Sequence, residues 1–493
     1  MKKKWLFLCF ISFCLSACSF NSFSPYTNFP NVTDTGERIE GENFYKPESY
    51  RIDYEEIYQD FPYESDRMIN FPHTGDAKLL VVPISFANYT CSKTRLGCKD
   101  TRTQIQNVFF GKESHTTRES VASYYAKSSF GKLRITGEVT PWYETSYRVE
   151  EIKTDTSYHL LSQLLEDAIA WAKSKVDISI YDQNHDGFID STCFIYTAPY
   201  EENTHLWAFQ SSLNTTSNIA SPNVKNYLWA SCSFMNLRNA FSKPDARTYI
   251  HETGHLLGLD DYYPTDNSSY FPLGKSDMMD LNIGDHNAFS KMLLNWTRPY
   301  VVTGDCEITI QPSYQNGDCI LVKTGWNETA MDEYLLLEFY TPKGLSAKDS
   351  RLTFSYGNEK IRPLTQSGIK IYHVDARIGH YMTFNPDPFV GYDNEETRKR
   401  VEELNQQGQR TYRKIANHNT ASLSPDQNYL ITLLEPDGST YERNIATNES
   451  LFQKGNSLSS YAFHDGSTLD YEITIVSISN QEARIRFHQI SPR

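Results

Sequence analysis

The stretch HETGHLLGLDDYY, residues 251–263, holds the residue types and spacing best suited to chemistry. His251 and His255 are four residues apart, so on a helix their imidazoles lie side by side, about one turn apart. Glu252 completes the H-E-x-x-H arrangement, in which the histidines hold zinc and the glutamate serves as a base. Because a motif this short also arises by chance, the alternative is an ordinary helix with two histidines on its surface.

The residues that follow the second histidine favour the zinc interpretation. Gly258 can end the helix in a backbone conformation that other residues resist, so the chain can turn back toward the metal. Asp261, three residues beyond the glycine, is then the predicted third zinc ligand, and Asp260 is its neighbour. Three protein ligands leave zinc a fourth position for water, whose pKa the metal lowers toward neutrality. Glu252 would take a proton from that water.

The spacing of these ligands resembles the extended motif of metzincin-like peptidases. In particular, the chain resembles the immune inhibitor A family of secreted bacterial metallopeptidases, in patches from about residue 76 to about residue 375. The most specific patches are the zinc motif and GDHNAFSKMLLNW, residues 284–296. The others are AKLLVVPISF (77–86), SVASYYAKSSFGKLRITGEVTPWY (120–143), YDQNHDGFID (181–190), SDMMDLNI (276–283), EYLLLEFY (333–340) and SGIKIYHVD (367–375).

The resemblance implies a fold, a reaction and a set of site residues. The fold would be α+β, with a metzincin-like domain of twisted sheet and helices followed by a β-rich domain. The reaction would be zinc-dependent hydrolysis of peptide bonds, in which Glu252 passes the proton of the water to the leaving amine. A methionine turn would lie beneath the zinc at Met279, with Met278 as the next choice. The alternative is that Met279 fills a gap in the core.

The sequence departs from the family pattern at three positions. Asp260 stands where the family usually has proline, and Ser276 stands where it usually has tryptophan. In LWAFQ, residues 206–210, Phe209 takes the place of a family histidine. None of these departures removes a metal ligand, so they bear on substrate preference and rate.

Further residues around the motif are weaker candidates. Tyr262 and Tyr263 could approach the zinc or pack, and packing is favoured because aromatic side chains usually serve the core. His286 is a weaker metal candidate, since GDHNAFSK favours the start of a helix with Asp285 as its N-cap.

A second metal site, for calcium, is predicted in DQNHDGFID, residues 182–190. Oxygen ligands recur there at alternating positions, as in the first part of a calcium loop, and Gly187 allows a sharp turn. Cys193 occupies the position of the bidentate glutamate of an EF-hand, so the loop is not a full EF-hand. The alternative is a loop of Asx turns. The predicted ligands are Asp182, Asn184, Asp186, the carbonyl of Phe188, and Asp190.

The N-terminus has the pattern of an export signal. Three lysines precede the apolar run Trp5–Leu15, which is too short to span a membrane. Residues 15–18, Leu-Ser-Ala-Cys, resemble a bacterial lipobox. Residues 1–18 are therefore predicted to be a lipoprotein signal, and Cys18 a lipid anchor that is the chain's one link to the membrane at the cell surface. The alternative is a plain signal peptide.

The cysteine count also fits export. Nine cysteines are present, three of them in the signal at positions 9, 14 and 18. The even number that remains suggests disulfides, whose pairing the sequence leaves open. The alternative is free buried thiols. The simplest assignment is two local pairs, Cys91–Cys98 and Cys306–Cys319, with Cys193 and Cys232 left over.

Beyond the signal, the hydrophobic pattern divides the chain into three segments. Residues 19–75 are polar with little periodicity, which is typical of a tether or a short pro-segment. Residues 76–300 are the predicted peptidase domain, with a buried strand at 78–86 and an amphipathic helix at 157–174 that Ser157 could cap. Residues 301–493 carry regularly spaced short strands, which favour a β-sandwich with a polar helical insertion near 380–425.

Composition narrows the function classes. The net charge of −14 and the lack of a basic stripe argue against a nucleic-acid partner. The predicted function is a lipid-anchored zinc endopeptidase that acts on protein or peptide substrates, and the oligomeric state is left open. The alternative is a surface lipoprotein for binding or adhesion that keeps the peptidase fold without turnover.

Overall fold

The structure is a computed structural model of the 493-residue chain. The residues that it describes are 39–48, 71–239, 241–263, 271–356, 359–383, 389–392, 395–408, 411–414, 429–440 and 445–490. The predicted signal, its Cys18 and most of the predicted tether lie outside these ranges. None of the helices in the described ranges is long and apolar enough to cross a membrane.

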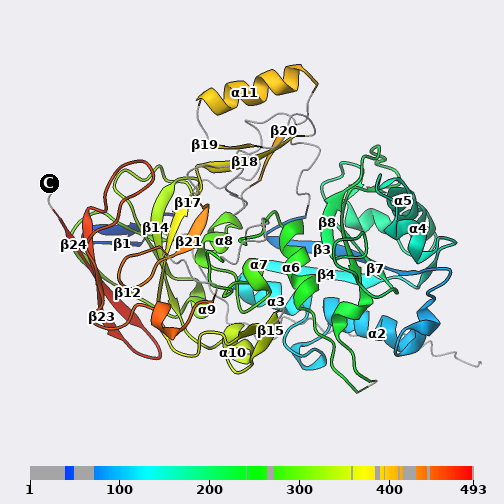
Figure 1. The fold of residues 1–493 in the computed structure, drawn as a ribbon, viewed down its shortest axis with the longest axis horizontal. Coiled ribbons are helices and arrows are strands. Elements are labelled where there is room, and N and C mark those ends of the chain that lie inside the picture. Colours follow the sequence, from blue (N-terminus) through cyan, green and yellow to red (C-terminus); the bar gives the residue numbers. More distant parts are fainter. Residues whose placement is uncertain are drawn as a thin grey trace, which may run out of the picture.

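The first half of the chain forms a mostly parallel sheet with the order β4-β3-β7-β10-β8, in which β5 pairs with the end of β3 (Figure 1). The last strand, β8, is antiparallel to β10, whereas the other neighbours run parallel. The strands are β3 (Gly75–Ser85), β4 (Leu133–Val139), β5 (Tyr143–Glu144), β7 (Thr192–Tyr196), β8 (Phe209–Ser212) and β10 (Asn226–Ser231). The helices around them are α2 (Gly97–Phe110), α3 (Val121–Ser128), α4 (Val149–Lys153), α5 (His159–Ala172) and α6 (Arg247–Leu256).

Helices cover both faces of this sheet. Successive side chains of a strand point to opposite faces, so Leu79 and Val81 of β3 join one core with α2, α3 and α6. Leu80 and Val82 join a second core, with α5. A strand that is buried on both faces reads as a continuous apolar run, which is why residues 78–86 stood out in the sequence.

The second half of the chain is dominated by two sheets that enclose a further core. One sheet has the order β1-β2-β11-β13-β14-β17-β21, and the other has the order β12-β24-β23-β22. The strands of the larger sheet are β1 (Ile39–Gly41), β2 (Phe44–Lys46), β11 (Tyr300–Val302), β13 (Cys319–Val322), β14 (Glu333–Tyr340), β17 (Gly368–Asp375) and β21 (Ile431–Leu433). Those of the smaller sheet are β12 (Cys306–Ile310), β22 (Ser457–Leu458), β23 (Tyr471–Ile478) and β24 (Ala483–Gln489).

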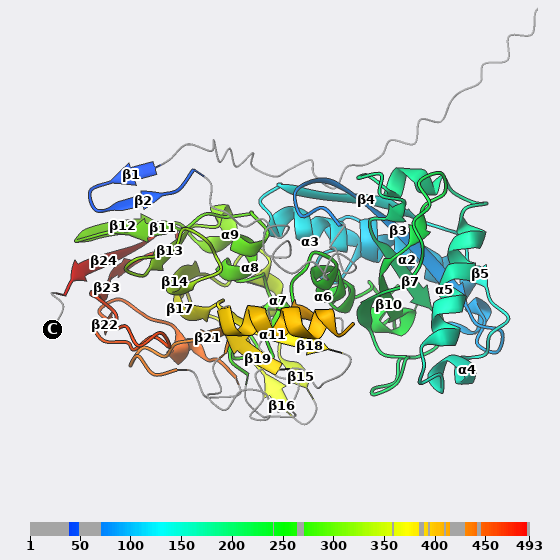
Figure 2. The ribbon, with the colours of Figure 1, turned by 90° about the horizontal axis from the view of Figure 1, so that it is seen from above.

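Two segments add to this second half. The hairpin β1–β2 lies within the predicted tether, and it extends the larger sheet because β2 pairs with β11. The predicted polar insertion contains the helix α11 (Glu395–Gln406) beside the strands β19-β18-β20, which project together from the upper edge of the molecule in Figure 1 and lie in front of its middle in Figure 2. These strands are β18 (Ile378–Thr383), β19 (Phe389–Tyr392) and β20 (Thr411–Lys414).

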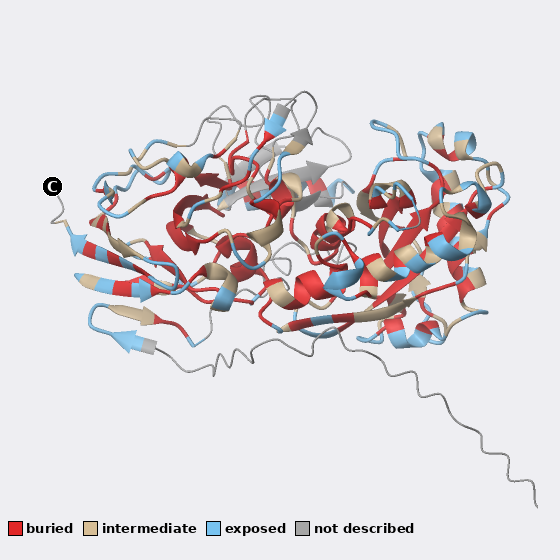
Figure 3. Ribbon diagram, turned by 90° about the horizontal axis from the view of Figure 1, so that it is seen from below, coloured by how far each residue is buried: buried red, intermediate tan, exposed pale blue. Residues whose placement is uncertain are grey.

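The two halves share one hydrophobic core. Tyr249 of α6 and Leu79 of β3 belong to the same cluster of buried residues as Leu336 of β14 and Tyr372 of β17. The short helices α7 (Met278–Leu281) and α8 (Ala288–Leu293) also contribute to it. Figure 3 shows this burial running through the middle of the molecule, with exposed residues along the outer strands. The change in pattern near residue 300 therefore marks a change of architecture within a continuous core.

Two predictions about the fold are wrong. Cys306 and Cys319 are free and do not form a disulfide, because β12 and β13 belong to different sheets. The predicted cap Ser157 is also displaced, since Asp155 accepts hydrogen bonds from the backbone N–H groups of Leu160 and Leu161 at the start of α5. The pair Cys91–Cys98 is confirmed as a disulfide, and Cys193 and Cys232 are free and buried.

This cysteine pattern gives a first prediction. Alkylation in denaturant should label Cys306 and Cys319 without reduction, and Cys91 and Cys98 only after reduction. Replacing both Cys91 and Cys98 by serine should lower the free energy of unfolding by about 2 kcal/mol, the order expected for so short a loop. A peptide that joins Cys306 to Cys319 in a non-reduced mass map would contradict the assignment.

Candidate metal centre

The helix α6 carries the H-E-x-x-H motif and is held firmly against the first sheet. The hydroxyl of Tyr249 donates a hydrogen bond of 2.7 Å to the carbonyl of Ser231 at the end of β10. The hydroxyl of Tyr125, on α3, donates one of 2.7 Å to the carbonyl of Ile250. Since both tyrosines are fully buried, these bonds fix the rotation of the helix about its axis.

The end of α6 turns the chain back toward the histidines. Gly258 has φ +94°, a left-handed conformation that glycine adopts without a steric penalty. Its N–H donates to the carbonyl of His255, and the N–H of Leu259 donates to the carbonyl of Gly254, which together form a Schellman motif. The structure thus confirms that Gly258 ends the helix, and Asp261 lies three residues further along the chain.

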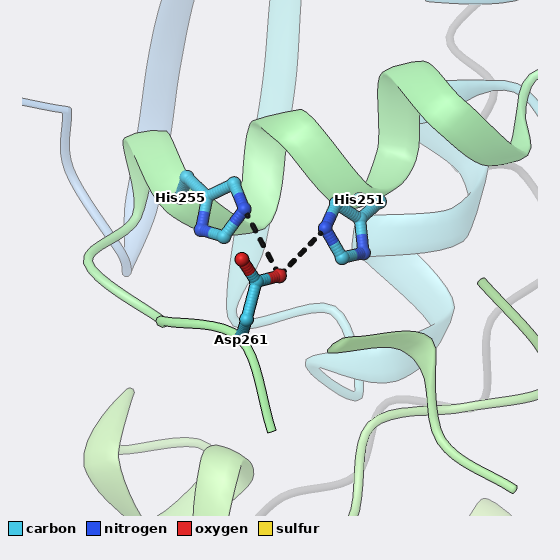
Figure 4. A group of neighbouring side chains, drawn as sticks. All are labelled: His251, His255 and Asp261. Atoms are coloured by element: carbon cyan, nitrogen blue, oxygen red, sulfur yellow. Dashed lines mark ion pairs between the residues drawn. The ribbon is translucent and has the colours of Figure 1, made fainter. Parts of the chain in front are cut away.

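His251, His255 and Asp261 converge on one point (Figure 4). An oxygen of Asp261, Oδ1, lies 3.0 Å from Nε2 of His251 and 3.5 Å from Nε2 of His255. This oxygen is buried, yet it has no partner with hydrogen-bond geometry. The two imidazole nitrogens and this carboxylate oxygen are therefore placed as ligands of one cation. Two histidines and one aspartate form a ligand set that suits zinc.

The other nitrogen of each imidazole is already committed. Nδ1 of His251 lies 2.9 Å from the carbonyl oxygen of Met278, and Nδ1 of His255 lies 2.8 Å from that of Leu259. A carbonyl oxygen can only accept, so each Nδ1 carries a proton and each Nε2 is left to bind a metal.

Electrostatics at the site favour a positive charge between the three side chains. Burial lowers the pKa of His255, but the charge of Asp261 outweighs burial and raises that pKa to about 10. Burial acts to raise the pKa of Asp261, yet the two imidazoles hold it well below its usual value. The carboxylate is therefore ionised at neutral pH and available as a metal ligand.

Glu252 lines a cavity of about 550 Å³ that His251 also lines. Its oxygen Oε2 is buried and makes no hydrogen bond. Burial raises the pKa of its carboxyl, against the effect of the two nearby imidazoles. A buried, unpaired carboxylate with a raised pKa is suited to proton transfer. Other parts of the cavity wall come from Trp207, Phe234, Tyr263 and Phe354.

Met279 packs against α6 at Gly254, between the two histidines, and its role as a methionine turn beneath a zinc stays a prediction. A Cβ atom built on Gly254 would stand 2.6 Å from Sδ of Met279, so the thioether occupies the space that this glycine leaves on the underside of the helix. The carbonyl of the preceding Met278 accepts the bond from His251. The segment thus supports the metal ligands through packing and through one backbone carbonyl.

Two of the neighbouring candidates, Tyr262 and His286, serve structural roles. Tyr262 is fully buried and its hydroxyl lies 2.7 Å from that of Ser290, so it packs as expected. His286 is buried against Tyr124, Tyr125 and Trp296 and belongs to neither group of metal-ligand atoms in the described residues.

The prediction that Asp285 caps the following helix is wrong. Asn287 is the cap of α8, because its side chain accepts from the N–H of Ser290. Asp285 instead accepts from the hydroxyl of Ser128 at 2.6 Å and pairs with Lys291.

Two of the family departures lie close to the site. Phe209 begins β8, directly after two residues that line the cavity, Trp207 and Ala208. The hydroxyl of Ser276 makes two hydrogen bonds. Its oxygen accepts from Nζ of Lys370 at 3.2 Å, and it donates to the carbonyl of Leu273. Neither residue enters the ligand set.

The predicted calcium loop is organised by hydrogen bonds from its own backbone. Asp182 accepts from the N–H groups of Asp186 and Gly187, and Asp190 accepts from that of Gln183. Burial, with the charges of Asp182 and Asp186, raises the pKa of Asp190 to about 7. The side chain of Asn184 and the N–H of Phe188 also bond within the loop, to Asp186. This pattern is typical of Asx turns, and calcium binding stays a prediction.

A second group of potential metal ligands went unnoticed in the sequence. Glu333, His373 and His464 bring one donor atom each within 4.8 Å of one another. His373 and Asp375 alternate on β17, which is a signal for one shared strand face. No local spacing connects them to His464, so sequence patterns could not assemble the cluster.

No protein-family model matches this chain, and no curated protein matches it. The resemblance to the immune inhibitor A family therefore stays a prediction that rests on the motifs. What the site can do is argued from its geometry.

The adjacent aspartates give a matched test of the ligand set. Asp261→Asn should weaken zinc binding by more than about 100-fold, since even changes outside the ligand shell cost about 10- to 100-fold. Asp260→Asn should leave the affinity nearly unchanged. Isothermal titration of the metal-free proteins with zinc measures both. Equal losses in the two variants would contradict Asp261 as the ligand.

The contact between Gly254 and Met279 gives a third prediction. Gly254→Ala should lower the free energy of unfolding by about 1–3 kcal/mol, because the added methyl overpacks the space that the thioether fills. The double variant Gly254→Ala/Met279→Ala should lose less than the sum of the two single losses, since the methyl then occupies vacated space. Denaturant unfolding of the four proteins measures the coupling, and strict additivity would show that the two residues do not interact.

Proposed function

We propose that this chain is a zinc-dependent endopeptidase whose metal is held by His251, His255 and Asp261. The observation that carries the proposal is the convergence of three metal-ligand atoms beside a glutamate with an unpaired buried oxygen at the wall of a cavity. Both imidazoles are locked in the tautomer that leaves Nε2 to a metal.

Each part of the reaction has a residue suited to it. Bound zinc supplies acidification of a water and polarisation of the scissile carbonyl. Glu252, with its unpaired Oε2, accepts the proton of that water and delivers it to the amine that leaves. The rigid attachment of α6 keeps Glu252 and the histidines in fixed relation, so little reorganisation is needed during the reaction.

The strand β8 supports a peptide as the substrate class. It is the last strand of its sheet, and all four of its residues are partly exposed. It lies beside α6 and continues from the cavity wall at Trp207 and Ala208. An extended peptide can add to such an edge through main-chain hydrogen bonds, which places its backbone next to Glu252.

The proposal includes the finer assignments made from the sequence. The first half of the chain is a metzincin-like catalytic domain, and the two sheets of the second half form a sandwich. Cys18 carries a lipid that holds the enzyme at the cell surface. Calcium binding by the loop at 182–190 belongs to the same set of proposals.

The decisive variant is Glu252→Gln, which removes the base and keeps the shape of the side chain. Casein digestion should fall by about 10²- to 10⁴-fold, the usual contribution of a general base, while zinc content stays at the level of the parent. Glu166→Gln, on the exposed face of α5, is the matched control and should digest casein normally.

Two outcomes of this experiment would contradict the proposal. Digestion by Glu252→Gln at the parent's rate would exclude the mechanism. A fully zinc-loaded parent that cleaves neither casein nor a diverse peptide library would favour the binding protein without turnover.

A further inference from the structure

A second cluster of metal-ligand side chains lies in the other half of the molecule. Glu333 begins β14, and His373 and Asp375 end β17, which pairs with β14 so that Glu333 stands opposite Asp375. His464 comes from the turn between β22 and β23, where the N–H of Phe463 donates to the carbonyl of Ser467. The cluster therefore joins two paired strands of the larger sheet to a connection of the smaller one.

The donor atoms of this cluster face one another. Nε2 of His373 lies 3.0 Å from Oε1 of Glu333, and Nδ1 of His464 lies 3.9 Å from the same oxygen. Two imidazoles and one carboxylate form a ligand set that suits zinc and similar divalent transition metals.

The surrounding groups orient Glu333 toward the imidazoles. Its other oxygen, Oε2, accepts from Nη2 of Arg377 at 2.6 Å and from the N–H of Asp465 at 3.1 Å. Oε1 is thereby directed at His373, and it also accepts from the N–H of His464. Arg377 binds both oxygens of Asp375 at 2.9 Å, and Asp375 lies 2.9 Å from Nδ1 of His464. The bonds that Arg377 and the N–H of Asp465 make to Oε2 of Glu333 are outer contacts of the kind that orient metal ligands in known sites. Asp375 instead faces the same nitrogen of His464 as Glu333 does, so its carboxylate lies beside the ligand atoms.

Burial and charge also favour a cation here. Glu333 and Asp375 are fully buried, and ionised carboxylates are costly to bury without compensation. Three carboxylates, those of Glu333, Asp375 and Asp465, face two cationic side chains, Arg377 and Lys323. With both imidazoles neutral, these described side chains carry a net charge of −1, three negative charges against two positive ones. A divalent cation between Oε1 and the imidazoles more than offsets that charge.

We propose that Glu333, His373 and His464 form a second metal site, for zinc or a similar divalent transition metal, with Asp375 as the neighbouring carboxylate. The site is separate from the α6 centre in residues and in elements. Its ion fastens the turn at 463–467 to β14 and β17, so it stabilises the packing of the two C-terminal sheets and takes no part in the proposed hydrolysis. The competing arrangement is a closed network without an ion, in which His373 donates to Glu333 and His464 donates to Asp375.

The test compares zinc stoichiometry and melting temperature across matched variants. Since the described part of the chain holds two ligand clusters, the parent should bind two zinc ions at them, and Asp261→Asn and His464→Ala should each bind one. Zinc should raise the melting temperature of Asp261→Asn, and this shift should vanish in Asp261→Asn/His464→Ala. His488→Ala is the control, because His488 forms an exposed pair with Asp305 and should leave both sites intact.

The competing network predicts a different result. If Asp261→Asn and Asp261→Asn/His464→Ala bind the same amount of zinc and show the same melting temperatures with and without it, the second site does not exist. His464→Gln replaces the alanine variant if alanine disturbs the turn, because glutamine keeps a polar side chain there but is a poor zinc ligand. All these readouts are independent of peptidase activity, so they hold whatever the outcome for Glu252→Gln.

Discussion

The rest of the site depends on one close contact, in which Nε2 of His251 and Nε2 of His255 both face the buried Oδ1 of Asp261. Nε2 of His251 and Oδ1 of Asp261 are 3.0 Å apart, yet that oxygen has no partner in hydrogen-bond geometry. Such an arrangement persists only where the surrounding structure imposes it. Here the backbone holds these side chains in place. Two carbonyl oxygens fix the imidazoles, and the turn at Gly258 brings the chain back so that Asp261 faces them.

The C-terminal sheets help to hold that arrangement. The segment beneath α6 is bonded to the larger sheet, since the carbonyl of Pro272 accepts from the N–H of Leu433 and that of Ser276 accepts from Lys370. Another contact ties Gly284 to the carboxylate of Asp349 at 2.8 Å. Residues far along the chain thus set the position of Met278 and Met279 under the helix. Because the two halves share one core, the second half of the chain helps to position the metal ligands.

The errors in the sequence-based predictions arose where residues close in sequence were assigned roles that only the fold could decide. Asp285 and Asn287 are both good helix caps, and the choice fell to Asn287 because Ser128 and Lys291 engage the aspartate. Cys306 and Cys319 are close in sequence, but the strands that carry them enter different sheets. For Asp285 and for the cysteine pair the deciding contacts came from distant parts of the chain, whereas Ser157 lost the cap position to Asp155, two residues before it.

The sequence by itself determined whatever depends on local spacing: the two histidines on one helix face, the glycine that ends the helix, the buried strand at β3 and the succession of C-terminal strands. Tertiary structure alone placed Met279 under Gly254, left β8 as an open edge beside the cavity, and gathered Glu333, His373 and His464 from three separate segments. The physical reason is that helix and strand periodicities relate residues a few positions apart. Strand order and register, by contrast, are set by burial summed over the whole chain, which no short pattern records.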